Sequence, residues 1–122
     1  MTRNALRAIW LAIGWVMVVV IWIISLIPLR DIPALDFEFS DKLEHMVAYL
    51  ILMTWFGVAY ANSRWLRVAG WLTLMGIGIE IAQRQTGYRM FDLLDIVADL
   101  LGIAAAWAVL PLITRHNRSL AP

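Results

Sequence analysis

Long apolar stretches alternate along the chain with short segments that hold most of its charges. The stretch 8–29 contains no charged residue over 22 positions, and the stretch 46–63 contains none over 18. Two further apolar stretches, 65–83 and 93–113, are interrupted only by isolated charged residues. A helix of about 20 residues crosses the hydrocarbon core of a bilayer. The pattern therefore predicts four membrane-spanning helices, over about 8–28, 43–61, 65–83 and 93–113.

The composition supports a membrane protein and excludes several other classes. The 122 residues leave room for one domain, and 62% of them are hydrophobic while 16% are charged. A soluble domain is about half apolar and about a quarter charged. The chain has no cysteine, which excludes disulfides and thiolate metal sites, and its net charge of +1 gives no basis for binding nucleic acid. We therefore expect an all-α fold, an integral membrane four-helix bundle that occupies 1–122 as a single domain.

The distribution of charge predicts the orientation of this bundle, because arginine and lysine are retained in cytoplasmic loops. If the four helices alternate in direction, all nine acids fall on one side of the membrane or in the half of the membrane next to it. The opposite side holds six of the ten basic residues, namely Arg3, Arg7, Arg64, Arg67, Arg115 and Arg118. Both the N-terminus and the C-terminus are therefore expected in the cytoplasm.

Polar residues recur at three- and four-residue spacing on three of the predicted helices, near the ends that face the acidic side. Residues spaced in this way share one face of a helix. An ionised carboxylate inside a span costs roughly 2.5 to 3.5 kcal/mol, so such residues face protein or water instead of lipid. We expect the three faces to converge on an outward-opening polar cavity at headgroup depth, lined by Asp41, His45, Tyr49, Glu80, Gln83, Arg89, Asp95 and Asp99.

Two local patterns predict how the helices begin and pack. Ala98, Gly102 and Ala106 recur at every fourth position, and small residues on one face allow helices to approach closely in a membrane. Asp41 and Glu44 have the spacing of a capping box, which predicts that the second helix opens at Asp41. The preceding segment, 31–40, is either a lid across the outer surface or a plain amphipathic connector.

Taken together, the polar residues resemble the VanZ-like family. The resemblance covers about 41–102 and consists of Ser40, Asp41, Lys42, His45, Tyr49, Glu80, Gln83, Arg89, Asp95 and Gly102. It departs from the family pattern at Asp99, where asparagine is expected, and this difference adds an acid to the site. The resemblance implies a multi-pass protein of the bacterial inner membrane with a role in the cell envelope, since the namesake of the family is associated with tolerance to the glycopeptide teicoplanin. It implies no particular reaction.

The residue types at the predicted site suit acid–base chemistry. His45 lies one helical turn after a carboxylate that can hold its tautomer, and Glu80 and Asp95 are carboxylates within spans, so these three are expected to be catalytic. The residues expected to bind substrate are Asp41, Lys42, Tyr49, Gln83, Arg89 and Asp99. Two alternatives stay open: the basic residues neutralise the acids in a salt-bridge network, or the carboxylate oxygens hold a divalent cation.

Three functions are compatible with such a site. The first is an enzyme that acts on an envelope lipid or a lipid-linked cell-wall precursor, with Lys42 and Arg89 binding an anionic head. The second is a non-catalytic protein, alone or as a homo-oligomer, that binds a headgroup, moves protons or scaffolds an envelope protein partner. The third is purely structural, with buried ion pairs holding the helices together. No cofactor other than the divalent cation is indicated.

Overall fold

The computed structural model describes residues 2–27, 38–87 and 92–116, and these residues form four long helices and one short one. The long helices are α1 (Arg3–Leu26), α2 (Glu38–Ala59), α3 (Trp65–Gln85) and α4 (Leu93–His116), and the 3-10 helix η3 (Asn62–Arg64) joins α2 to α3. The described residues contain no strand. The predicted all-α fold is therefore confirmed.

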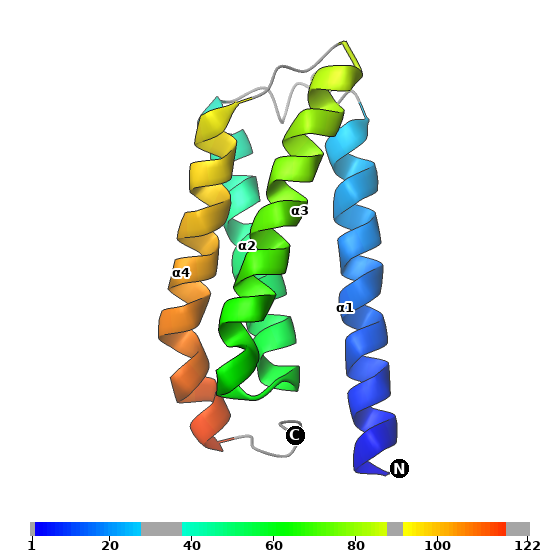
Figure 1. The fold of residues 1–122 in the computed structure, drawn as a ribbon, viewed down its shortest axis with the longest axis vertical. Helices are drawn as coiled ribbons and strands as arrows, with labels where there is room; N and C mark the ends of the chain where they lie inside the picture. Colours follow the sequence, from blue (N-terminus) through cyan, green and yellow to red (C-terminus); the bar gives the residue numbers. More distant parts are fainter. Residues whose placement is uncertain (1, 28–37, 88–91, 117–122) are drawn as a thin grey trace.

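The helices alternate in direction along the bundle (Figure 1). As a result, the start of α1 and the end of α4 lie at the same end of the bundle. Helix α2 contacts each of the other three helices, and its contact with α4 is the most extensive in the molecule. The ends of α1 and α3 and the starts of α2 and α4 therefore meet at the opposite end.

Two helices begin earlier than the sequence predicts. Helix α1 begins at Arg3, where the Thr2 hydroxyl accepts a hydrogen bond of 3.1 Å from the Ala5 amide and caps the helix. Helix α2 begins at Glu38, so the prediction that it opens at a capping box on Asp41 is wrong. No proline or glycine lies between Pro33 and Asp41, and nothing in the local sequence prevents the helix from starting sooner.

The predicted stripe of small residues forms the contact between α4 and α2. Ala98 and Ala106 are buried, and a Cβ atom added at Gly102 would clash with the backbone carbonyl of Met46 on α2. Only glycine allows the two backbones to approach this closely. The prediction that Ala98, Gly102 and Ala106 form a packing face is confirmed, and the close contact at Gly102 holds α4 against α2.

Three of the described helical segments are long and apolar enough to cross a membrane: Arg3–Leu26, Asn62–Gln85 and Leu93–Thr114. Helix α2 is not among them. Its first turns carry Lys42, Glu44 and His45. Large apolar side chains on α1 point outward, and Gly14 is the one buried residue of that helix. Such a continuous exposed apolar surface is typical of contact with lipid.

Candidate functional site

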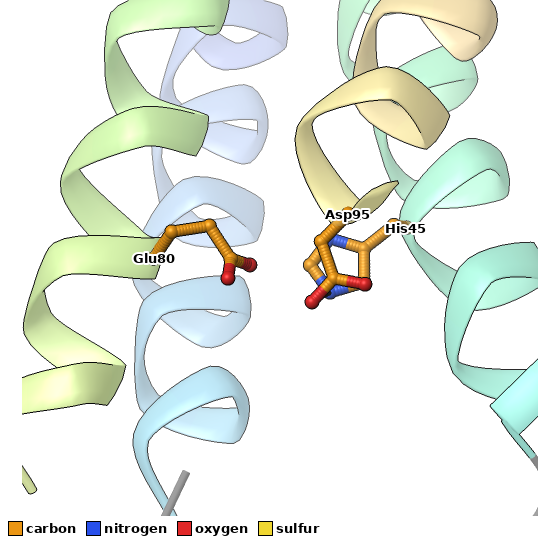
Figure 2. A group of neighbouring side chains, drawn as sticks. All are labelled: His45, Glu80 and Asp95. Carbon is orange, nitrogen blue, oxygen red and sulfur yellow. Dashed lines mark ion pairs between the residues drawn. The ribbon is translucent and has the colours of Figure 1, made fainter. Parts of the chain in front are cut away.

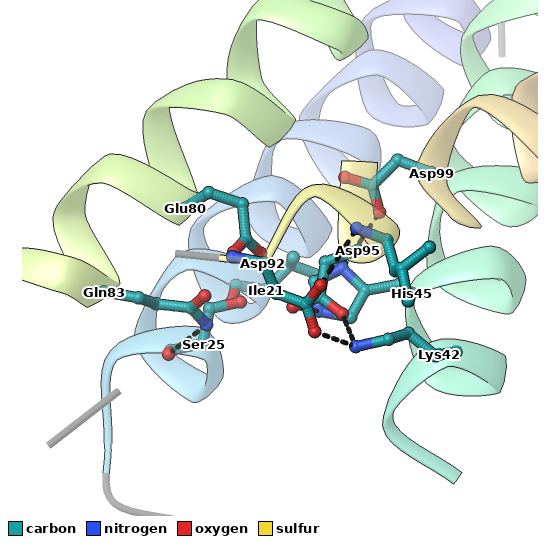
Figure 3. Close-up of polar contacts among 10 residues, drawn as sticks. Ile21, Ser25, Lys42, His45, Glu80, Gln83, Asp92, Asp95 and Asp99 are labelled. Carbon is teal, nitrogen blue, oxygen red and sulfur yellow. Dashed lines mark hydrogen bonds and ion pairs between the residues drawn. The ribbon is translucent and has the colours of Figure 1, made fainter. Parts of the chain in front are cut away.

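An ion-pair network joins the start of α2 to the start of α4. Lys42 Nζ lies 2.5 Å from Asp92 Oδ2 and also pairs with Asp95 Oδ1 (Figure 3). Burial lowers the pKa of Lys42, but hydrogen bonds to Asp92 and Asp95 outweigh this effect and raise it overall. The same hydrogen bond from Lys42 is the main reason that the pKa of Asp92 lies below its usual value. Both shifts favour the charged forms of Lys42 and Asp92.

His45 lies between two carboxylates of α4. Its Nδ1 is 2.9 Å from Asp99 Oδ1, and its Nε2 is 3.7 Å from Asp95 Oδ2. An ionised carboxylate only accepts hydrogen bonds, so pairing with Asp99 assigns the proton to Nδ1 of the neutral imidazole. The Nε2 lone pair then faces the side of the cluster where Asp95 lies.

Glu80 reaches the same region from the last turns of α3, and its side chain is fully buried. Its Oε2 accepts a hydrogen bond of 3.1 Å from the backbone amide of Asp92 at the start of α4. The Asp92 side chain in turn accepts from the Leu94 amide at 2.9 Å and caps that helix. The positive end of the α4 dipole therefore lies against the Glu80 carboxylate. Glu80 Oε1 has no hydrogen-bond partner among the described residues.

The three residues expected to be catalytic come together from three different helices. His45, Glu80 and Asp95 each present a ligand-type atom, and these atoms all lie within 4.8 Å of one another (Figure 2). Their convergence agrees with the expectation drawn from helical spacing. One imidazole nitrogen and two carboxylates in a buried setting can transfer protons, bind a polar head or hold a cation.

Tyr49 and Asp99 lie deeper in the bundle, beside Gly76 of α3. Tyr49 is 1% exposed, and its hydroxyl has no hydrogen-bond partner among the described residues. A Cβ atom added at Gly76 would lie 2.5 Å from Asp99 Oδ2 and 3.2 Å from the Tyr49 hydroxyl. Gly76 thus makes room for two polar groups that a larger residue would displace.

Gln83 faces α1. Its amide nitrogen donates a hydrogen bond of 2.8 Å to the Ser25 carbonyl, in the last turn of α1 (Figure 3). The side chain is 2% exposed. This contact ties α1 to α3 at the polar end of the bundle, a positioning contact that helical spacing alone does not reveal.

The remaining predicted residues are only partly covered by the structure. Arg89 lies outside the described residues, and for Asp41 the structure describes only the helical backbone. Of the segment 31–40 that was predicted as a lid or connector, residues 31–37 also lie outside the described part, whereas 38–40 belong to α2.

Sequence reasoning did not assign Asp92 or Gly76 to the site. Asp92 precedes Asp95 by three residues, and this spacing places the two on one face of the helix, which was the available signal for its pairing with Lys42. Gly76 precedes Glu80 by four residues and therefore shares its face. Neither spacing identifies the partner on the neighbouring helix.

Comparison with known proteins gives one informative match. The chain matches no known protein family, and no solved structure matches it. It is similar to the uncharacterized protein C11E3.10 of Schizosaccharomyces pombe, with 38% identity over 94 residues. The match covers 72% of this chain and 56% of the yeast protein, so the chain spans little more than half the length of that relative.

Proposed function

We propose that this chain is a VanZ-like, multi-pass protein of a bacterial inner membrane that acts on the head of an envelope lipid or a lipid-linked cell-wall precursor. In this arrangement all four long helices span the bilayer, and both termini lie in the cytoplasm. The three helices that are apolar enough to cross support this proposal, as does the central place of α2 among them. The polar cluster then lies at the extracytoplasmic side.

The observation that carries the proposal is the convergence of His45, Glu80 and Asp95 inside an apolar bundle. Asp99 holds the imidazole so that His45 Nε2 accepts a proton from the substrate. Glu80, buried against the start of α4, is the second group that exchanges a proton with it. Ionisable residues are rare within membrane spans, and their usual reason is function.

The depth of the cluster suits a lipid head. Glu80 lies five residues before the end of α3, and Asp99 lies six residues after the start of α4. At about 1.5 Å per residue, both are roughly 8 to 9 Å inside the ends of their helices. Lys42 is nearer the end, and its side chain is 26% exposed, so the ion pairs that it makes with Asp92 and Asp95 lie at the outer edge of the cluster.

The test compares lipid extracts from cells that express the wild-type chain, His45→Gln, Glu80→Gln or Glu44→Gln. Glu44 is an exposed carboxylate next to His45 and is the matched control. We expect the wild type and Glu44→Gln to change one lipid class in the mass spectrum, and the other two variants to leave it unchanged. If folded His45→Gln and Glu80→Gln proteins give the wild-type lipid profile, the proposed acid–base role is wrong.

A non-catalytic role in headgroup binding is the second candidate, and the ion pairs favour it. Lys42 joins α2 to two carboxylates at the start of α4, as expected of a site that holds one fixed shape. Purified protein in lipid nanodiscs separates the two functions. Conversion of an added lipid supports the enzyme, whereas saturable binding without conversion supports the binding protein.

Single cysteines test the proposed orientation, because the natural chain has none. Gln85 and Asn62 are exposed residues at opposite ends of α3 and its 3-10 extension. We expect a membrane-impermeant maleimide to label Gln85→Cys in intact cells and Asn62→Cys only after the membrane is opened. The reverse labelling would place the polar cluster on the cytoplasmic side.

A further inference from the structure

Glu80 Oε1 is a buried acceptor without a protein partner in the described part of the chain. The side chain is 0% exposed, and Figure 2 shows its carboxylate directed toward Asp95 and His45. Leaving a buried acceptor unsatisfied is costly, and such groups in native proteins mark strain, a catalytic role, or a bound water or ion. A cation bound between these side chains would satisfy this oxygen.

The second observation is the way in which His45 is held. Its Nδ1 pairs with Asp99 Oδ1 at 2.9 Å, so that Nε2 faces Asp95. Histidine ligands of metals almost always donate their other ring N–H to a carboxylate or a carbonyl, which fixes the ring and raises its basicity. The Asp99 carboxylate is the group that accepts this hydrogen bond from His45.

The distances fit a single ion after small side-chain rotations. The candidate ligand atoms lie within 4.8 Å of one another. An ion bound by nitrogen and oxygen at about 2.0–2.2 Å holds its ligand atoms roughly 3 to 4 Å apart. The three side chains come from three helices, and closing the difference requires their ligand atoms to approach one another by about 1 Å.

The charges lead to the same conclusion. Among the described residues, the cluster contains four carboxylates, Glu80, Asp92, Asp95 and Asp99, and one ammonium group, that of Lys42, while His45 in its neutral form adds no charge. Lys42, which pairs with Asp92 and Asp95, offsets one negative charge, and a divalent ion would offset two more. Buried negative charge in an apolar bundle needs such compensation.

The geometry points to a binding site for one divalent transition-metal ion of the Mn²⁺ or Zn²⁺ class, held by His45 Nε2, Glu80 and Asp95. One imidazole with two carboxylates suits these ions better than Ca²⁺ or Mg²⁺, which take oxygen ligands almost exclusively. This inference deepens the proposed function, because it names a ligand of the same site.

Metal binding to the purified protein tests the inference directly. Protein in detergent is freed of metal with a chelator and titrated with Mn²⁺, followed by electron paramagnetic resonance, and with Zn²⁺, followed by calorimetry. We expect one ion per chain in the wild type and in the control Glu44→Gln, and binding weakened at least about tenfold in Glu80→Gln. Equal affinity of the wild type and Glu80→Gln for both ions would overturn the site.

Two further variants keep the test decisive. Asp95→Asn removes a different ligand from a different helix, and it replaces Glu80→Gln if that variant does not fold. Asp99→Asn leaves all three ligands in place and alters only the partner of Nδ1, so it should weaken binding by about 10- to 100-fold. Unchanged binding in both Asp95→Asn and Asp99→Asn counts against the site.

The metal and the proposed function can fail separately. Lipid conversion that persists in chelator, with no metal bound, would support the enzymatic function and contradict the metal site. Stoichiometric metal binding with an unchanged lipid profile would support the metal site and contradict the enzymatic function.

Discussion

Both ends of the bundle bury polar groups, but the two ends differ in whether these groups have hydrogen-bond partners. At the end where α1 begins and α2 ends, Trp10 and Trp55 stack with ring centroids 3.6 Å apart. Each indole N–H donates to the backbone carbonyl of the other residue, at 2.8 and 2.7 Å. Both indole N–H groups of this pair therefore have a hydrogen-bond acceptor.

Other polar groups at the tryptophan end are satisfied in the same way. Trp65 donates to the Gly57 carbonyl at 2.9 Å, and Arg7 donates to the Ala59 carbonyl at 3.1 Å, so carbonyls near the end of α2 gain partners. At the polar end, by contrast, Glu80 Oε1 and the Tyr49 hydroxyl are buried without a partner in the described part of the chain. The comparison teaches that the polar side chains named at the tryptophan end all have hydrogen-bond acceptors, whereas the polar side of the bundle keeps buried oxygens without a partner, which is why we place the proposed site there.

The largest effect is expected at the close contact between α4 and α2. Gly102→Val places a side chain against the Met46 backbone, which cannot move aside, so we expect a loss of about 3 kcal/mol in the free energy of unfolding. Unfolding by SDS in mixed micelles measures it. The control is Gly70→Val, because Gly70 has open space around it, and that variant should change stability by less than about 0.5 kcal/mol.

Removing the tryptophan stack should cost stability but not function. Trp55→Ala deletes a stacked ring and a hydrogen bond, so we expect a loss of about 2 to 3 kcal/mol, measured by the same titration. Trp71, which is 68% exposed, supplies the matched control Trp71→Ala, expected to be nearly neutral. Metal affinity should match that of the wild type in both variants. A loss of metal binding in folded Trp55→Ala would show that the tryptophan stack also supports the proposed metal site.

A methyl group beside Asp99 should affect both stability and the site. Gly76→Ala pushes against the Asp99 carboxylate and the Tyr49 hydroxyl, and we expect a loss of about 1 to 2 kcal/mol together with weaker metal binding. Gly70→Ala is the control and should be neutral or slightly stabilising, because alanine favours a helix. If Gly76→Ala binds metal as tightly as Gly70→Ala, the packing around Asp99 does not support His45.

The smallest change in stability is expected at the polar end itself. Glu80→Gln keeps the shape of the side chain and an acceptor for the Asp92 amide while it removes a buried charge. We therefore expect stability within about 1 kcal/mol of the wild type, or slightly higher. SDS unfolding and metal titration on one preparation test both halves of the prediction. A large loss of stability would assign Glu80 to the structure instead of the site.

Much of the fold could be predicted because it depends on local pattern. Four apolar stretches predicted four helices, although α2 begins at Glu38 instead of Asp41 because no residue stops it there. The four-residue repeat of Ala98, Gly102 and Ala106 predicted the face that packs on α2. These features need only helical geometry and the length of the apolar runs.

The site could be predicted only as far as helical faces allow. Spacing brought His45, Glu80 and Asp95 to the same end of the bundle, since helices that alternate in direction place their acidic ends together. It did not show that Gln83 turns to the Ser25 carbonyl, or that Lys42 bridges Asp92 and Asp95. Each of these pairings joins residues at least 50 positions apart in the chain.

The sequence by itself determined the helices, the apolar surface and the end of the bundle where polar residues gather, because each follows from the periodicity of neighbouring residues. The tertiary structure alone decided which polar atom meets which. The rotation and register of α2, α3 and α4 depend on close contacts such as Gly102 against Met46, and a shift of one residue would turn these side chains by about 100° about the helix axis. In the observed register, Nδ1 of His45 lies against Asp99, and Glu80 Oε1 is buried within the cluster.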